Sequence, residues 1–324
     1  MSKYVIKRIL LLIPVIIGVS FLIFTIMFFV PGDPARIILG ASGGNATEAD
    51  LIIKREQLGL NDPYIVQLGR FLYDTFIRQD FGTSYLTNTP VIKEIAVRFP
   101  RTLQLALLCI VIQVIVGIPL GLIAATHQNK LPDRICTLLA MIGVSLPEFW
   151  VALMLIIVFS LKLGWLPAYG FGGVKYFILP CIALALRGVA TLARLTRSNM
   201  LEVLHSDYIT TAKAKGIPEM RILLVHALPN GIIPVIQTLG SSFGASLGGA
   251  IVIENIFSIA GMGTYLMSAV ANLDYPIVRS SVIVLALAFS VVMLLVDIVF
   301  AFVDPRIKAQ YAGGTKRKKV NKNA

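Results

Sequence analysis

Charged residues are scarce in this 324-residue sequence, where they make up 14% of the chain while 56% of the residues are hydrophobic. A chain of this length and composition cannot cover a water-soluble globule with polar groups. The scarcity is also uneven, because residues 9–32, 102–126 and 227–253 contain no charged side chain. Each stretch is longer than the roughly 20 apolar residues that cross a bilayer. The composition therefore excludes a soluble domain and predicts an all-α, polytopic membrane protein.

Three further apolar stretches contain one charged residue each. They are residues 135–161 with Glu148, residues 176–193 with Arg187, and residues 280–303 with Asp297. Six transmembrane helices are therefore predicted, and the stretch 176–193 carries the weakest signal. Pro147 lies inside the third stretch and removes a backbone donor, which predicts a break in that helix.

The first apolar stretch has two interpretations, because basic residues precede it as they do in a secretory signal. Its apolar run is longer than the roughly 7–15 residues of such a signal, and no small-x-small cleavage site follows it. An uncleaved anchor helix over residues 1–31 is the prediction.

Several chemical signatures are missing. The sequence has no G-x-x-x-x-G-K-[ST] phosphate loop and no H-E-x-x-H, and no catalytic residue is predicted. His127, His205 and His226 are widely spaced, and the three cysteines lie in or beside apolar stretches without paired spacing, so neither a metal site nor a disulfide is expected. No internal repeat is visible, which argues against a transporter built from inverted halves.

The distribution of basic residues predicts the orientation in the membrane. With the amino terminus inside, the inner segments hold 17 Lys and Arg with 5 acids, and the outer segments hold 11 with 10 acids. Basic residues resist translocation, so both termini are predicted to be cytoplasmic. Because nearly all of the net charge lies on one face, it reflects topology and does not indicate nucleic-acid binding.

A polar, basic segment separates the fourth and fifth apolar stretches. It begins at Asp207 and reaches Gly216-Ile217-Pro218, which are start and stop signals of a short helix. We expect a helix over 207–217 that docks on a cytosolic partner. The residues assigned to this docking are Asp207, Tyr208, Thr211, Ala212, Lys213, Lys215, Gly216 and Ile217.

The longest segment outside the apolar stretches, residues 32–100, is predicted to be extracytoplasmic and to contain short helices. Thr47 and Asp50 have the spacing of a capping box, and Gly59 can end the helix that follows. A second amphipathic helix is predicted over residues 63–76. Such a segment either contacts an external partner or packs on the outer helix ends.

Residues 101–306 are predicted to form the core of the membrane domain. Residues 307–324 are predicted to form a basic cytoplasmic tail, which either binds anionic lipid or is merely solvated.

The fifth stretch carries small residues at helical spacing, with Gly240, Gly244 and Gly248 on one face. Such a face lets another helix approach closely, and it is alternatively one wall of a polar pathway. We expect this helix to be central. Candidate pathway residues are Ser145, Glu148, Gln237, Ser241 and Ser242. Charges inside spans are costly, so Glu148, Arg187 and Asp297 either serve the pathway, lie near helix ends or pair with one another.

Short motifs along almost the whole chain resemble one family. The chain looks like a permease subunit of bacterial ABC importers, in the branch for dipeptides, oligopeptides, nickel and glutathione. The motifs are Tyr4-Val5-Ile6-Lys7-Arg8, Pro31-Gly32-Asp33-Pro34, Leu58-Gly59-Leu60, Asp80-Phe81-Gly82-Thr83-Ser84, Leu131-Pro132-Asp133-Arg134, Gly164-Trp165-Leu166-Pro167, Ile178-Leu179-Pro180, Asp207-Tyr208, Ala212-Lys213-Ala214-Lys215-Gly216, Glu254-Asn255-Ile256-Phe257, Gly261-Met262-Gly263, Asp274-Tyr275-Pro276 and Asp304-Pro305-Arg306.

The resemblance implies the type I ABC importer permease fold and a location in the bacterial cytoplasmic membrane. The segment around Gly216 resembles the family's E-A-A-x-x-x-G coupling helix, which sits in a groove of the ATPase subunit. Ala212, Gly216, Leu228 and Pro229 match, whereas Thr210 and Thr211 stand where Glu and Ala are expected. The implied partners are a second homologous permease, two cytosolic ATPases that bind ATP and Mg²⁺, an external solute-binding protein and membrane lipid. This chain would bind no cofactor itself.

The expected cargo is a short peptide, because a mostly apolar passage with few polar groups suits solutes with variable side chains. A nickel chelate or glutathione is the alternative within the same family. A channel or ion-driven transporter would need no docking helix, and a membrane enzyme would need a convergent catalytic set that is absent here.

Overall fold

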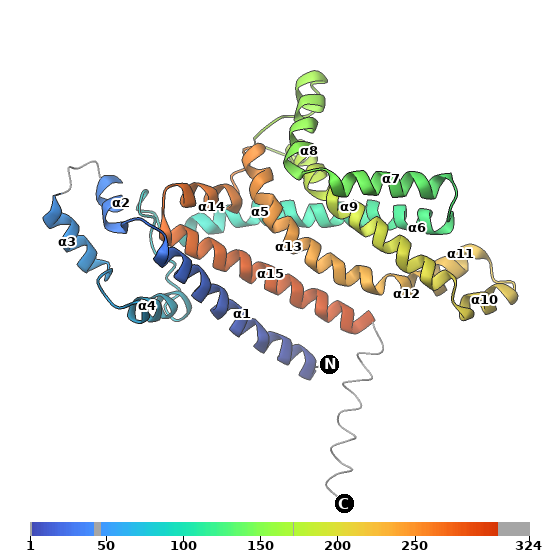
Figure 1. Cartoon of the computed structure of the whole chain (residues 1–324), viewed down its shortest axis with the longest axis horizontal. Coiled ribbons are helices and arrows are strands. Elements are labelled where there is room, and N and C mark those ends of the chain that lie inside the picture. Colours follow the sequence, from blue (N-terminus) through green and yellow to red (C-terminus); the bar gives the residue numbers. More distant parts are fainter. Residues whose placement is uncertain (1, 42–46, 171, 304–324) are drawn as a thin grey trace, which may run out of the picture. The chain divides into compact units, whose positions relative to one another are not determined.

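A computed structural model describes residues 2–41, 47–170 and 172–303 of the chain. Within those ranges the regular structure is helical, and Thr83 and Pro90 form an isolated β-bridge. Figure 1 shows the order of the elements. They are α1 (Ser2–Phe29), α2 (Pro34–Ala41), α3 (Glu48–Gln57), α4 (Tyr64–Phe76), α5 (Val91–Ile112), α6 (Ile118–Thr126), α7 (Leu131–Ser145), α8 (Glu148–Leu155), α9 (Val174–Leu204), α10 (Asp207–Ala214), α11 (Glu219–Arg221), α12 (Leu228–Gly231), α13 (Ile233–Ile256), α14 (Met262–Ala271) and α15 (Tyr275–Val303).

Three segments of π-helix interrupt this series. They are η1 (Gln113–Gly117), η2 (Ile156–Lys162) and η3 (Ile222–Ala227). The first joins α5 to α6, so the apolar helix runs without a break from Val91 to Thr126. Nothing in the hydrophobic pattern of the sequence predicted these wider turns, because a π-turn adds one residue without changing the polarity of the segment.

Five helices in the described residues are long and apolar enough to span a membrane, and a bent pair brings the number to six. The five are Ile6–Phe29, Val91–Thr126, Val174–Leu204, Ile233–Ile256 and Tyr275–Phe300. The second begins 11 residues before the predicted span at 102, because charged side chains mark the end of an apolar run but do not end a helix. The structure therefore confirms the predicted all-α, polytopic architecture.

The third predicted span is sharply bent. Leu131–Ser145 and Glu148–Lys162 meet at 103°. Leu146 between them is extended, with φ −78° and ψ 130°, and Pro147 follows with φ −64°. A residue before proline is driven out of the helical region, and proline cannot donate a backbone hydrogen bond, so the break predicted at this position occurs.

The chain divides into two compact units. Unit I contains residues 1–8, 104–258 and the segment from 291, and unit II contains residues 9–103 and 259–290. In unit I, α9 packs against α6, α7, α8 and α13. About 56% of the residues in its most apolar 18-residue stretch are buried, against 33% in the corresponding stretch of α13.

The prediction that the fifth span is central is therefore wrong for unit I, where α9 takes that place. The signal at α9 was weak because its apolar stretch, residues 176–193, is short and contains Arg187, although its mean hydropathy of 1.8 exceeds the 1.3 of α13. Small residues permit the close packing of its neighbours. A Cβ added at Gly121 of α6 would lie 2.5 Å from Ala193 O of α9, and one at Gly143 of α7 would lie 3.0 Å from the Cβ of Ala190.

Unit II contains the two short helices predicted in the segment 32–100. Thr47 caps α3 reciprocally with Asp50, which confirms the capping box, and Gly59 follows the helix at φ +62°. The helix α4 begins at Tyr64, whose hydroxyl lies 2.6 Å from Thr25 Oγ1 of α1. The helices α2 and α14 were not predicted. A buried apolar cluster joins α1, α5, α14 and α15 around Ile23, Ile95 and Met262.

Candidate functional site

The predicted docking segment forms α10, which begins at Asp207 and ends at Ala214. The Asp207 carboxylate lies in the first turn, where the helix dipole favours negative charge, and Lys213 lies in the last turn, where it favours positive charge. Ser206 occupies the position before the helix without capping it, because its hydroxyl donates to Val203 O at 2.6 Å.

The end of α10 is a Schellman motif. Ile217 N donates to Ala212 O at 3.3 Å, and Gly216 N donates to Lys213 O at 2.9 Å. Gly216 has φ +76°, the left-handed conformation that this motif requires and that glycine adopts without steric cost. A Cβ at Gly216 would meet nothing within 4 Å, so the constraint on this position is conformational and not a matter of space.

One face of α10 is anchored in unit I. Ile209 is fully buried and Ala212 is 9% exposed, and both belong to a cluster with Met200 of α9 and Ile222 and Ala227 of η3. Ile217 packs against the same cluster, which supplies the apolar contact typical of a Schellman motif. A displacement of α10 would therefore be transmitted directly to α9 and η3.

The opposite face of α10 is exposed. It carries Asp207, Tyr208, Thr210, Thr211 and Lys213, with Lys215 just beyond the helix. Tyr208 is 45% exposed, and its hydroxyl accepts a hydrogen bond from Asn230 Nδ2 of α12 at 3.1 Å. The arrangement presents polar, positively charged side chains on a helix whose other face is fixed.

The five candidate pathway residues do not form one cluster. Ser145 ends α7 and is exposed, and its hydroxyl donates to Met141 O at 2.9 Å. Gln237 and Ser241 are exposed on the first half of α13, and Ser242 beside them is half-buried.

Glu148 opens α8 directly after the break at Pro147 and packs near another part of α13. A Cβ added at Gly249 would lie 2.5 Å from Glu148 Oε2, two turns beyond Ser242. Arg187 of α9 acts on Glu148 electrostatically, but among the described residues no ion pair within 4 Å involves Glu148.

Asp297 has a different partner from those considered in the sequence analysis. Its Oδ2 lies 3.0 Å from Arg8 Nη1 of α1. The sequence analysis considered only Glu148 and Arg187 as partners of Asp297, because they are the other charges within apolar stretches. Arg8 precedes its apolar stretch, so polarity along the chain did not associate it with Asp297.

The glycines of α13 differ in their surroundings. A Cβ at Gly240 would lie 2.8 Å from Met293 Sδ of α15, whereas one at Gly248 would meet nothing within 4 Å. Gly244 is half-buried. The helix-packing assignment of Gly240, Gly244 and Gly248 stays a prediction.

The sequence analysis did not predict an ion pair that joins α7 to α9. Asp133 of α7 is 3% exposed and accepts from Arg197 of α9 through Nε at 2.5 Å and Nη2 at 2.8 Å. Asn129 N also donates to Asp133 at 2.8 Å. Both partners were visible as charges in inner segments, but a separation of 64 residues gave no signal that they meet.

Unit II contains a second ionic link. Arg55 of α3 donates to Asp33 Oδ2 through Nε at 3.0 Å and Nη2 at 2.6 Å, and Ala35 N donates to Asp33 Oδ1 at 3.1 Å. Burial alone would raise the pKa of Asp33, but the hydrogen bonds from Arg55 and Ala35 outweigh it, so the pKa lies below its usual value. The link joins the start of α2 to α3.

Together the helices define a multi-pass membrane protein that fixes a short polar helix beside its central helix. Comparison with known proteins identifies the family to which it belongs. The family model described as binding-protein-dependent transport system inner membrane component matches residues 117–309, and the model of the N-terminal part of such components matches residues 1–106.

Similar proteins agree with that match. The dipeptide transport system permease protein DppB of Alkalihalophilus pseudofirmus is 40% identical over 336 residues, covering 95% of this chain and 100% of that protein. The glutathione transport system permease protein GsiC of Escherichia coli K12 is 40% identical over 308 residues, covering 95% and 99%. The inward-facing MetNI methionine ABC transporter matches with a TM-score of 0.57 at 14% identity, covering 66% of this chain and 98% of that one.

The chain belongs to the family of binding-protein-dependent transport system inner membrane components. Its fold is that of a type I ABC importer permease, and it is a multi-pass protein of the inner membrane.

Proposed function

We propose that this chain is the permease subunit of an ATP-driven importer of short peptides and that α10 is its coupling helix. The observation that carries the proposal is the construction of α10. One face is locked against α9 and η3 through Ile209 and Ala212, and the other presents polar and basic side chains. Motion of a partner bound to the exposed face would thus move the centre of unit I.

The partners follow from what this chain lacks. Two cytosolic ATPases would bind ATP and Mg²⁺ and dock on α10, a second homologous permease would complete the pathway, and an external binding protein would deliver the solute. This chain would hold no cofactor. The inner segments carry the excess of Lys and Arg, so α10 and both termini would be cytoplasmic. ATP-driven closure would then shift the chain between inward and outward access, two packings of similar free energy.

Within unit I, Ser145, Glu148, Gln237, Ser241 and Ser242 would contact the solute in one or other of these packings. Their spread along α7, α8 and α13 fits a pathway better than a single binding site. The small residues Gly240, Gly244 and Gly248 would serve helix packing, within this chain at Gly240 and against the second permease at Gly248.

Peptide transport is supported by the 40% identity to a dipeptide permease along its whole length. The test is uptake of a radiolabelled dipeptide by cells that carry the complete system and no other peptide importer. We expect uptake that excess unlabelled di- to pentapeptides abolish. Uptake that mixed peptides leave unchanged would contradict the peptide assignment.

Glutathione is the second candidate, because the glutathione permease is equally similar over nearly its whole length. It is itself a tripeptide, so ordinary tripeptides are the matched control in the same competition. Inhibition by glutathione at concentrations where tripeptides of similar size have no effect would assign the system to glutathione. A nickel chelate that alone abolishes uptake would support the alternative drawn from the sequence.

A further inference from the structure

Arg279, in the first turns of α15, is half-buried and has no anionic partner within 4 Å among the described residues. Its Nε is buried and has no hydrogen-bond partner, and among the described residues no carboxylate lies within 4 Å of it. The titratable groups that act on it are the phenols of Tyr85 and Tyr275, which are uncharged at neutral pH. An arginine cannot release its proton, so this positive charge persists.

Two aromatic rings lie against the guanidinium of Arg279. They stabilise its charge in part but do not accept its hydrogen bonds. The Cζ of Arg279 lies 4.9 Å from the ring centre of Phe71 in α4 and 5.8 Å from that of Phe24 in α1, and these two rings stack at 5.3 Å. A cation over an aromatic face gains on the order of 1 kcal/mol, but the ring accepts none of the five N–H donors in the plane of the guanidinium.

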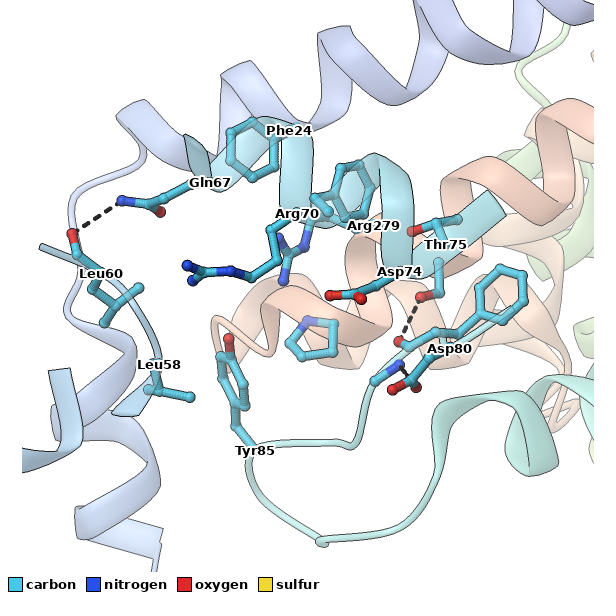
Figure 2. Close-up of a pocket in the computed structure, with 15 residues that line it drawn as sticks. Phe24, Leu58, Leu60, Gln67, Arg70, Asp74, Thr75, Asp80, Tyr85 and Arg279 are labelled. Atoms are coloured by element: carbon cyan, nitrogen blue, oxygen red, sulfur yellow. Dashed lines mark hydrogen bonds between the residues drawn. The ribbon is translucent and has the colours of Figure 1, made fainter. Parts of the chain in front are cut away.

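Two adjoining cavities of unit II, of about 200 and 350 Å³, share Arg279 as a lining residue. Both volumes are far above the roughly 10–15 Å³ that one water molecule needs. In the smaller cavity, Arg279 from α15, Arg70 and Asp74 from α4, and Tyr85 from the following loop reach into the same space (Figure 2). Arg279 therefore has both unsatisfied donors and open volume beside it.

The other charged side chains that line these cavities already have partners within unit II. Arg70 donates to Asp62 at 2.7 Å, Asp33 accepts from Arg55 at 2.6 Å, and Asp74 faces Arg78 at 3.4 Å. Asp80 accepts from Gly82 N at 2.8 Å. Among these described lining residues, Arg279 is thus the cation that no ion pair holds, and Asp80 is the anion that no ion pair holds.

A second observation is independent of Arg279. Tyr275, one turn earlier on α15, is 7% exposed and lines the larger cavity, and its buried hydroxyl has no hydrogen-bond partner. A phenol is a good donor to an anion. The buried hydroxyl of Tyr275 and the buried Nε of Arg279 both lack an acceptor beside the larger cavity, and one bound acceptor could satisfy both.

We propose that these cavities form a binding site for a small monocarboxylate with an apolar body, held by the guanidinium of Arg279 and the hydroxyl of Tyr275. The planar fork of arginine matches the two oxygens of a carboxylate. The apolar part of the ligand would lie against Phe24, Leu60 and Phe71, which line the same space. A dianion such as phosphate is disfavoured, because Asp74 and Asp80 line the smaller cavity and only one positive charge is free.

The test measures binding of butyrate to the full chain in lipid nanodiscs, with butyramide as a probe of nearly the same shape but without charge. We expect saturable binding of butyrate and at least tenfold weaker binding of butyramide, about 1.4 kcal/mol. Arg279→Gln should weaken butyrate binding at least tenfold and Tyr275→Phe severalfold. The control Arg134→Gln, which removes an exposed guanidinium outside both cavities, should leave binding unchanged.

Thermal unfolding supplies a readout that does not need a high affinity. Butyrate should raise the Tm of the wild type but not that of Arg279→Gln, and without butyrate this variant should be at least as stable as the wild type, because it no longer buries an unpaired charge. Equal binding of butyrate by Arg279→Gln, equal binding of butyramide, or displacement of butyrate by equimolar phosphate or chloride would each overturn the proposal. If Arg279→Gln does not fold, Tyr275→Phe and the comparison of the two probes on the wild type still decide it.

Discussion

At the scale of single residues, backbone conformation explains Gly216 better than packing does. The position has φ +76° and open space around it, and it closes α10 through two hydrogen bonds. A side chain there meets no neighbour, but a left-handed backbone costs a residue with a Cβ roughly 1–2 kcal/mol. The proposed docking function thus depends on the helix end keeping its geometry.

Gly216 therefore gives a graded prediction. Gly216→Val should loosen the end of α10 and uncouple ATP hydrolysis from peptide uptake, while the spans still insert. Gly216→Asn should retain most uptake, because Asn tolerates the left-handed region. Uptake and substrate-stimulated ATPase activity of the assembled complex measure both effects. Gly69→Ala is the control, since its added Cβ meets nothing and its φ is not positive. Full coupling in Gly216→Val would contradict the proposed function of α10.

Asp33 gives a prediction about pH. Its folded pKa lies below the unfolded value of about 3.9, so the ionic link to Arg55 stabilises α3 above that value and the stabilisation is lost as the pH falls through the folded pKa. The hydrogen-exchange protection factors of residues 48–57 should stay constant from pH 7 to 5 and fall below about pH 4. Asp33→Asn should show the lower protection factors already at pH 7. A variant with wild-type protection at pH 7 would show that Arg55 contributes nothing to α3.

At the scale of elements, α9 organises unit I because neighbouring helices present glycine to it. Gly121 of α6 and Gly143 of α7 approach the backbone or side chains of α9 too closely for larger residues. Gly248 of α13 lies in open space within this chain, although all of these residues look alike in the sequence.

This difference predicts opposite outcomes for the same substitution. Gly121→Ala should destabilise the purified chain by about 1–3 kcal/mol, because the added methyl would overlap Ala193 O and the side chain of Thr196. Gly248→Ala should leave the Tm of the chain alone unchanged or slightly raised. Thermal unfolding in detergent checks both. An unchanged Tm for Gly121→Ala would mean that α6 and α9 can move apart to accommodate the added methyl group.

The pair of Asp133 and Arg197 gives a further prediction for α7 and α9. Asp133→Asn should cost about 1–3 kcal/mol, because it leaves a half-buried guanidinium without its anion. The double variant Asp133→Leu with Arg197→Met should recover much of this loss, since it removes both charges. The Tm values of the three proteins test the coupling. Equal losses in the single and double variants would show that the ion pair itself is not what joins the helices.

At the scale of the whole molecule, the chain belongs to a family of binding-protein-dependent transport components. We propose that its function as a permease depends on other subunits. The exposed face of α10 and the open surroundings of Gly248 are features that a partner would cover in an assembled importer.

The corresponding prediction is that this chain alone does not transport. Vesicles that contain only the purified chain should show no peptide uptake with ATP or with a proton or sodium gradient. Vesicles with the second permease, the ATPases and the binding protein should show uptake that requires ATP inside. Uptake by the chain alone under an ion gradient would place it among secondary transporters.

The sequence by itself determined the local structure. The apolar stretches predicted the helices because the free energy of transfer into lipid depends mainly on composition. The capping box of Thr47 and Asp50, the break at Pro147 and the left-handed glycine after α10 were predictable because each depends on a few neighbouring residues. The family motifs lie in such segments as well, so the family was recognisable before any contact was known.

Only the tertiary structure decided which residues meet. The 103° angle between α7 and α8, the central position of α9, and the pairs Asp133–Arg197 and Arg8–Asp297 depend on packing between segments far apart in the sequence. Arg279 is the clearest case. In the sequence it is one basic residue among many, and only the folded unit II places its guanidinium beside two aromatic rings and open volume, with no ion pair among the described residues. Long-range pairing of this kind is set by the shape of the whole core, which no local pattern encodes.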